Sequence, residues 1–151
     1  MTATEAVHSG STDFGHSPSN RIAIAWGLIV GVANAAAPLA LWWLDPGTVH
    51  ALAITLIASV YIGFAVADGR SRILAIECGV AAAFVVVASI AVIGSPWLLV
   101  AAYAGHGLKD LWQHRTQFVR GTRWWPPFCA TIDWLVASII AIEITAGVHF
   151  H

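Results

Sequence analysis

The segment YAGHGLKDLWQHRTQFVRGTRWWPPFCATIDW, residues 103–134, ends one apolar stretch of the chain and begins the next. It carries ionisable and metal-ligating side chains in or beside two segments that are otherwise apolar enough to cross a membrane. These side chains are His106, Asp110, His114, Cys129 and Asp133. An ionisable group at membrane depth costs free energy and is usually retained because it has a function. The segment therefore predicts where a functional site lies.

The composition is that of an integral membrane protein. Of the 151 residues, 58% are hydrophobic and only 10% are charged, against about 45–50% and about 25% in soluble domains. The mean hydropathy is +0.76. A net charge of −1 provides no basic face for nucleic acid, and two cysteines are too few for a disulfide framework.

The fold class that these patterns predict is an all-α transmembrane bundle of five helices. The expected spans are residues 22–44, 48–67, 73–93, 97–114 and 128–148. The fourth is clearly apolar only to Leu108 and needs its helix to continue to His114. Residues 1–20 are polar and predict a disordered tail ahead of a single domain, residues 21–151, although a cleaved signal peptide is a competing interpretation.

The basic residues orient this bundle. All seven Lys and Arg residues fall on one side of the five-span arrangement: Arg21, Arg70, Arg72, Lys109, Arg115, Arg120 and Arg123. The positive-inside rule then predicts a cytoplasmic N-terminus and an outward C-terminus. A four-span alternative, with residues 97–114 as a re-entrant or surface segment, would return the C-terminus to the inside.

Small residues predict helix-packing surfaces on the first two spans. Gly27, Gly31, Asn34 and Pro38 share one stripe of the first span, and Ser59 and Gly63 belong to a similar stripe on the second. Glycines four apart allow close helix contact within the bundle or in a homo-oligomer. The proline predicts a mild kink, which could alternatively line a substrate path.

The candidate site combines three helices near the cytoplasmic end. Tyr103, His106, Asp110 and His114 fall within one arc of the fourth span, and Cys129 and Asp133 share a stripe of the fifth. At about 1.5 Å per residue, Glu77 enters the bilayer to a similar depth as Asp110 and Asp133. We expect His106 as base or ligand, Asp110 and Asp133 as carboxylates that orient it or bind metal, and Glu77, His114, Cys129 and Tyr103 in support.

Three kinds of chemistry fit this set. His106, Asp110, His114 and Asp133 could bind zinc, iron or manganese. The same groups could exchange protons as an acid/base pair or relay. Alternatively they form a structural network in which the carboxylates pair with Arg115, Arg120 or Arg123. Cys129 is more typical of a small apolar core residue, His50 of a solvated helix end, and Lys109 of a side chain that reaches the cytoplasmic surface.

The same region resembles a family of small, uncharacterised bacterial integral membrane proteins. Their pattern is a helix of the type HGxxDxxHH followed by W-W/Y-x-P-F-C-x-x-x-D, and the matching residues here are 106–114 and 124–133. The match covers about 30 residues. Gln113 departs from it by replacing the first of the two histidines. The resemblance implies a helical protein of the bacterial cytoplasmic membrane with this polar site.

The leading functional hypothesis is a membrane-embedded enzyme or binding protein for a lipid-soluble molecule, reached from the cytoplasmic leaflet. Its expected partners are the lipid bilayer, that lipid-soluble substrate and a candidate divalent metal ion. A proton- or ion-coupled carrier is the first alternative, which would need a polar route through the outer half of the bundle. The second is an accessory subunit that docks on a larger membrane complex.

Overall fold

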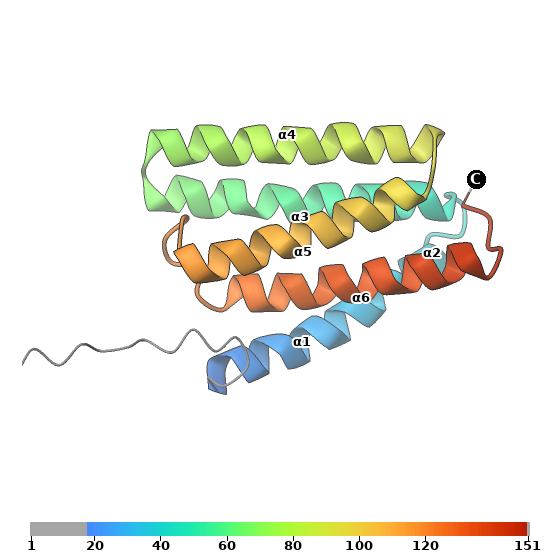
Figure 1. The fold of residues 1–151 in the computed structure, drawn as a ribbon, viewed down its shortest axis with the longest axis horizontal. Helices are drawn as coiled ribbons and strands as arrows, with labels where there is room; N and C mark the ends of the chain where they lie inside the picture. Colours follow the sequence, from blue (N-terminus) through green and yellow to red (C-terminus); the bar gives the residue numbers. More distant parts are fainter. Residues whose placement is uncertain (1–17, 151) are drawn as a thin grey trace, which may run out of the picture.

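The computed structural model describes residues 18–150, and this part of the chain folds into helices joined by short turns (Figure 1). The elements are α1 (Pro18–Ala35), α2 (Ala37–Ala40), α3 (Pro46–Asp68), α4 (Ser71–Ile93), α5 (Trp97–Thr116) and α6 (Trp125–Thr145). The all-α prediction is confirmed. By length and composition, α3, α4 and α6 can each cross a membrane. The tail expected at residues 1–20 lies outside the described residues, except that helix α1 already begins at Pro18.

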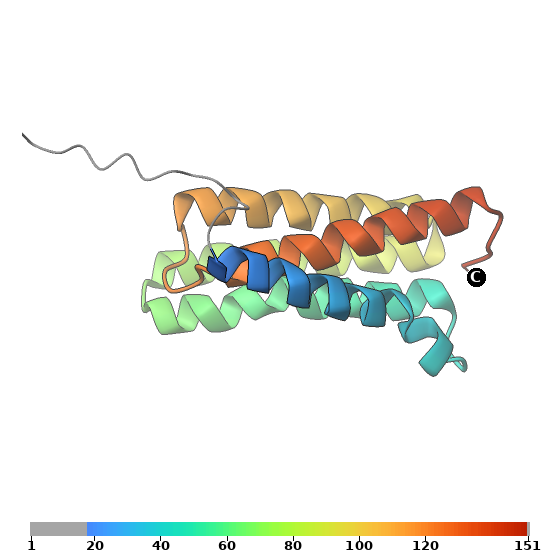
Figure 2. The ribbon, with the colours of Figure 1, turned by 90° about the horizontal axis from the view of Figure 1, so that it is seen from below.

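The five long helices alternate in direction and pack as a layered bundle (Figures 1 and 2). Helix α5 lies between the α3–α4 pair and α6, and α1 packs on the other side of α6. Buried apolar residues from several helices form the main core, among them Ile54, Leu99, Val136 and Ile140. Large apolar side chains also cover the outside of the bundle, for example Val86, at 57% exposure, on α4. Such an outer surface suits contact with lipid rather than water.

The first expected span, residues 22–44, is not one helix. Helix α1 ends at Ala35, and the four-residue α2 follows with Pro38 in its first turn. Proline has no N–H to donate to the carbonyl of Asn34, and its ring disfavours a continuous helix at this position. The Leu39 N–H instead donates to the Ala36 carbonyl at 3.0 Å. The predicted mild kink is therefore a break, which turns the chain towards α3.

The other helices begin and end close to the expected positions because their termini carry local signals. Asp45 caps α3 by accepting a hydrogen bond from the Thr48 N–H at 2.8 Å. Gly69 ends α3 in the left-handed conformation, with φ of 77°. Helix α6 begins at Trp125 rather than Phe128, because Pro126 and Pro127 fit the first turn, where no N–H donor is required.

Helix α5 is continuous through its polar end, as the five-helix arrangement requires. Its 20 residues run from Trp97 to Thr116 along α6. The turn at its polar end is tied to the turn between α3 and α4: the Arg70 guanidinium donates to the Asp68 carboxylate at 2.6 Å and to the Phe118 carbonyl at 2.7 Å. The hydrogen bond to Asp68 also raises the pKa of Arg70, which keeps this ion pair charged. The loops that carry the arginines thus gather at one end of the bundle.

Gly27 and Gly31 lie where α1 contacts α6. A Cβ atom built on Gly27 would lie 2.7 Å from the Phe128 carbonyl oxygen, and one on Gly31 would lie 2.9 Å from a methyl group of Leu135. Gly63, on the second expected stripe, has no such neighbour within 4 Å. The first stripe therefore faces α6, whereas the second faces outwards.

We expect Gly27→Ala to destabilise the protein and Gly63→Ala to leave it as stable or more so. Both changes improve helix propensity by up to about 1 kcal/mol. At Gly27 the new methyl group meets backbone that cannot move aside, and such overpacking typically costs about 1–3 kcal/mol. Thermal unfolding of the two variants in detergent measures the difference. A Gly27→Ala variant as stable as Gly63→Ala would contradict the packing of α1 on α6.

Candidate functional site

The candidate site forms where α5 and α6 cross closely. His106 and Asp110 lie one turn apart on α5, and Asp133 faces them from α6. Gly107 allows this approach because the Trp134 indole occupies the space that a Cβ atom would need. A larger residue at this position would push the helices apart. The sequence therefore provides both the polar groups and the small residue that lets them meet.

His106 is the centre of a buried hydrogen-bonded group. Its Nδ1 atom lies 2.8 Å from Asp133 Oδ2 and 3.5 Å from Asp110 Oδ2. The Tyr61 hydroxyl of α3 donates to Asp110 Oδ1 at 2.6 Å. All three of the expected central residues, His106, Asp110 and Asp133, are 0% exposed. The structure thus brings together the histidine and both carboxylates on which the sequence argument rested.

Cys129 belongs to the same group. One ligand atom from each of His106, Asp110, Cys129 and Asp133 lies within 4.8 Å of the others, and all four residues are buried. An imidazole nitrogen, two carboxylate oxygens and a thiol sulfur could hold a metal ion at this spacing. The sequence favoured a small core residue at Cys129 and gave it only a supporting place in the site. Cys129 faces the group because of how α6 is rotated about its own axis, and residue spacing within one helix does not define this rotation.

His114 lies away from this group. It follows His106 by eight residues on α5, which corresponds to about 12 Å along the helix axis. Its side chain is half-buried near the turn that follows α5. The proposed ligand set of His106, Asp110, His114 and Asp133 is therefore wrong in one member, because a separation of two turns is too long for a single coordination sphere. Cys129 takes that place from α6.

Glu77 is buried near the site but pairs with another side chain. Its Oε2 atom lies 2.9 Å from the Lys109 Nζ atom, which also lies 3.5 Å from the centre of the Tyr61 ring. Lys109 is therefore directed into the bundle rather than towards the cytoplasmic surface, where the sequence argument placed it. Its long aliphatic stem allows either direction, and the buried carboxylate of Glu77 favours the inner one. Tyr61 joins this ion pair to Asp110.

Asp110 and Asp133 do not pair with arginines, as the structural alternative required. Within residues 18–150, Asp110 contacts Tyr61 and His106, and Asp133 contacts His106. Arg115, Arg120 and Arg123 are exposed. The two carboxylates lie too deep in the bundle for these exposed arginines to reach. Arg120 instead contacts the turn after α3, where its backbone N–H donates to the Asp68 carboxylate at 2.8 Å.

Aromatic rings surround the free side of the imidazole. Phe84 of α4 lies edge-on to His106 with 5.1 Å between ring centres, and the Tyr61 ring lies at 6.1 Å. The Nε2 atom of His106 has no hydrogen-bond partner. An imidazole held by a carboxylate at Nδ1 has its other nitrogen available for chemistry. Apolar walls around that nitrogen exclude water from it.

Tyr103 belongs to a second polar group nearer the other end of the bundle. Its hydroxyl donates to the His50 carbonyl at 3.1 Å and lies 3.4 Å from the Asn34 side-chain oxygen. His50 is only 1% exposed and packs near Phe150. The expectation that His50 is solvated at a helix end is therefore wrong. The C-terminal residues fold back over it, and local sequence gave no sign of this contact.

Gln113 is buried and supports the loop before α6. Its side-chain amide donates to the Val119 carbonyl at 2.8 Å and to the Thr122 hydroxyl at 3.1 Å. It also accepts from the Val119 N–H at 3.3 Å. A neutral histidine side chain has one donor and one acceptor, so it could not make all three of these hydrogen bonds. Gln113 thus anchors the loop from a buried position and takes no part in the group around His106.

Comparisons with protein-family models, curated proteins and solved structures give no match to this chain.

The contact between Tyr61 and Asp110 can be tested by a double-mutant cycle. Tyr61→Phe removes the hydroxyl and leaves a buried carboxylate oxygen with one partner fewer, which should cost about 1–3 kcal/mol of stability. Once Asp110→Asn has changed the acceptor, the same substitution should cost less, with a coupling energy of about 0.5 kcal/mol or more. Unfolding of the four proteins in detergent gives this energy. Strict additivity would show that the two side chains do not interact.

Proposed function

We propose that the protein is a multi-pass protein of the bacterial cytoplasmic membrane that binds a divalent transition metal ion at the group of His106, Asp110, Cys129 and Asp133. One observation carries this proposal: four ligand atoms from two helices lie within 4.8 Å of one another in a fully buried position. In the five-span arrangement that we propose, the group would lie nearer the cytoplasmic end, where the basic residues gather. The resemblance to small bacterial membrane proteins agrees with this location.

The charge of the buried residues supports a cation at this position. Asp110, Asp133 and Glu77 are carboxylates, and within residues 18–150 Lys109 is the one amine paired with any of them. With neutral histidine and thiol, the formal charge of the four groups is −2. A buried charge is costly unless a partner compensates it. A divalent ion would neutralise the set, whereas the competing explanation requires carboxylates that carry protons.

The donor set narrows the choice of metal. One nitrogen, two carboxylate oxygens and one sulfur suit zinc or ferrous iron better than manganese or magnesium, which prefer oxygen. Four protein ligands without an open position are typical of structural zinc sites. When bound, such an ion would supply charge neutralisation and a fixed geometry between α5 and α6. His106 would hold it through Nδ1, the nitrogen that both carboxylates face, and the ion would then replace the hydrogen bond between Nδ1 and Asp133.

Action on a lipid-soluble molecule, the function expected from the sequence, would require one of these ligands to give way to the substrate. We therefore place metal binding first. In that enzyme or binding role, His106 would act as base or ligand and Asp133 would orient it.

A proton- or ion-coupled carrier is the second candidate, and the buried position of His50 favours it. With Tyr103 and Asn34, His50 provides polar groups in the outer half of the bundle. Uptake of an ion or solute that depends on a proton gradient, measured in vesicles containing the protein, would identify such a carrier. An accessory subunit would need a docking surface other than Gly27 and Gly31, which face α6.

Metal binding predicts one zinc or iron ion for each chain after purification, measured by elemental analysis. Replacing a ligand, as in Cys129→Ser or Asp133→Asn, should weaken binding by more than about 10-fold, because even residues that only support ligands contribute this much. Cys78→Ser is the matched control, since Cys78 is exposed on α4. With cobalt as probe, the thiolate-to-metal absorption should disappear only in Cys129→Ser. Metal-free wild-type protein that also takes up no added zinc or cobalt would refute the proposal.

The proposed orientation predicts which turns are accessible from outside the cell. In a Cys78→Ser background, a membrane-impermeant maleimide should label Ser95→Cys in intact cells and Thr116→Cys only after the membrane is opened. Both positions are exposed. Cys129 is buried and should not react. Labelling of both cysteines in intact cells would instead support the four-span arrangement, and the reversed pattern would refute a cytoplasmic N-terminus.

A further inference from the structure

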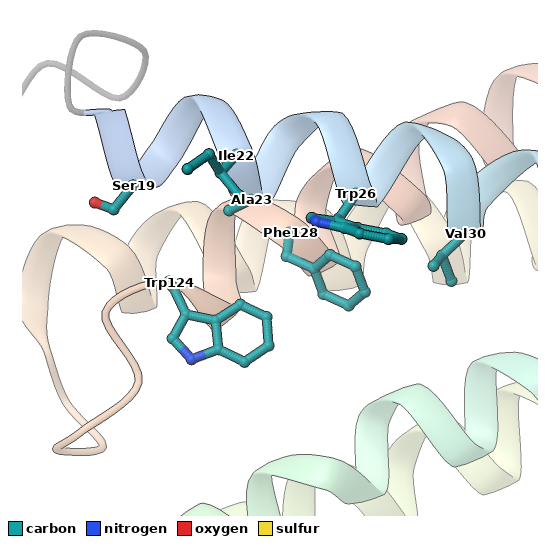
Figure 3. A pocket seen from close by; sticks show the side chains of 7 residues that line it. All are labelled: Ser19, Ile22, Ala23, Trp26, Val30, Trp124 and Phe128. Atoms are coloured by element: carbon teal, nitrogen blue, oxygen red, sulfur yellow. The ribbon is translucent and has the colours of Figure 1, made fainter.

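An apolar groove runs between α1 and the start of α6 (Figure 3). Trp26 and Val30 line it from α1, and Trp124 and Phe128 line it from the other side. Its volume is about 490 Å³, within the range of roughly 300–1,000 Å³ that is typical of small-ligand sites. Ser19 lies at the end nearest the start of α1, so the groove has one polar end.

The groove exists because α1 approaches α6 closely at only part of its length. Gly27 and Gly31 hold the two helices together beside the groove, where a Cβ atom on Gly27 would lie 2.7 Å from the Phe128 carbonyl oxygen and 2.8 Å from Thr131. Next to this contact, the large side chains of Trp26 on α1 and Trp124 before α6 form the two sides of the groove. Trp26 is 58% exposed and Trp124 is 50% exposed. The rest of residues 18–150 thus leaves about half of each ring uncovered.

We propose that this groove binds an acyl chain of an anionic phospholipid from the cytoplasmic leaflet. The inference rests on the membrane orientation in the proposed function but not on the metal site. The ligand class is a lipid with a phosphate headgroup and net negative charge.

The walls select an apolar chain. Apart from Ser19, the side chains that line the groove are apolar or aromatic. In a bilayer such a surface is open to lipid from the side, and an ordered chain can fill it without desolvating any charged group. Trp124 stands at the end of the groove that also holds Ser19, where an indole typically lies at the level of lipid headgroups.

The end of the groove selects the headgroup. Arg123 is exposed and immediately precedes Trp124 in the chain. Basic residues next to a membrane attract anionic lipid by about 1 kcal/mol each. An arginine guanidinium can also form paired hydrogen bonds with phosphate oxygens. A zwitterionic lipid would keep the chain contact but lose most of this attraction.

A second copy of the chain fits less well. A helix about 10 Å in diameter occupies roughly 800 Å³ over each 10 Å of its length. The groove, at about 490 Å³, is smaller than two turns of such a helix. An acyl chain is narrow enough to lie along it.

Native mass spectrometry of the whole protein tests the proposal with phosphatidylglycerol and phosphatidylcholine as probes. The wild-type chain should retain one phosphatidylglycerol, with at least a tenfold preference over phosphatidylcholine. Ala23→Phe should fill the groove and reduce retention of both lipids at least tenfold, because Ala23 lines it and is only 3% exposed. Ala25→Phe, on the exposed side of α1, is the matched control and should behave as wild type.

Two more variants keep the test decisive if Ala23→Phe does not fold. Val30→Trp narrows the groove from a position that is already 38% exposed, and it should lower lipid retention without disturbing the core. Arg123→Gln should abolish the preference for phosphatidylglycerol while the chain contact remains. Equal retention by wild type, Val30→Trp and Ala25→Phe would overturn the proposal, as would a lipid-free dimer whose formation Val30→Trp prevents. Metal content, measured on the same samples, reports separately on the proposed function.

Discussion

The hydrogen bond between His106 and Asp133 is the contact on which the arrangement of the bundle depends. It joins α5 to α6 at 2.8 Å in a position that is fully closed to solvent. Either residue alone would be a costly buried group, because neither lipid nor apolar side chains can compensate a charge or a vacant hydrogen-bonding atom. The two helices must therefore keep the rotation and depth at which these residues meet. Apolar packing alone would allow several such positions with similar energies.

The rest of the structure provides the conditions for this contact. Gly107 leaves room for Trp134, so that α5 and α6 approach closely enough for short side chains to meet. Tyr61 satisfies one oxygen of Asp110 from α3, and Glu77 from α4 compensates Lys109. Each of the four helices α3 to α6 thus contributes at least one polar residue. A buried network of this kind specifies one arrangement because a partial network leaves polar groups unpaired.

Much of the fold follows from local sequence, because apolar length and turn residues define α3, α4 and α5 to within two residues and α6 to within three. The first span was predicted too long because residues 36–44 stay apolar, although Pro38 lacks the N–H that a continuous helix needs. For the site, helical spacing identified His106, Asp110 and Asp133. It missed Tyr61 and gave Cys129 only a supporting role, because these positions depend on how whole helices are rotated about their axes. The separation of His114 from His106 by about 12 Å, in contrast, already follows from their spacing along one helix. A tyrosine within an apolar helix was the available signal, since its buried hydroxyl needs a partner.

The closed character of the site limits what an ion there could do. Because the group is complete only when α5 and α6 are packed together, a metal ion would bind the folded chain and not the unfolded one. Its binding energy would then add to the stability of the bundle. The same closure keeps the ion from a substrate unless the helices separate. Gln113 bears on this point, since its hydrogen bonds to Val119 and Thr122 fix the loop that joins α5 to α6. Opening the site would have to break these bonds as well, so the geometry favours a centre that holds the two helices together over one that exchanges ligands rapidly.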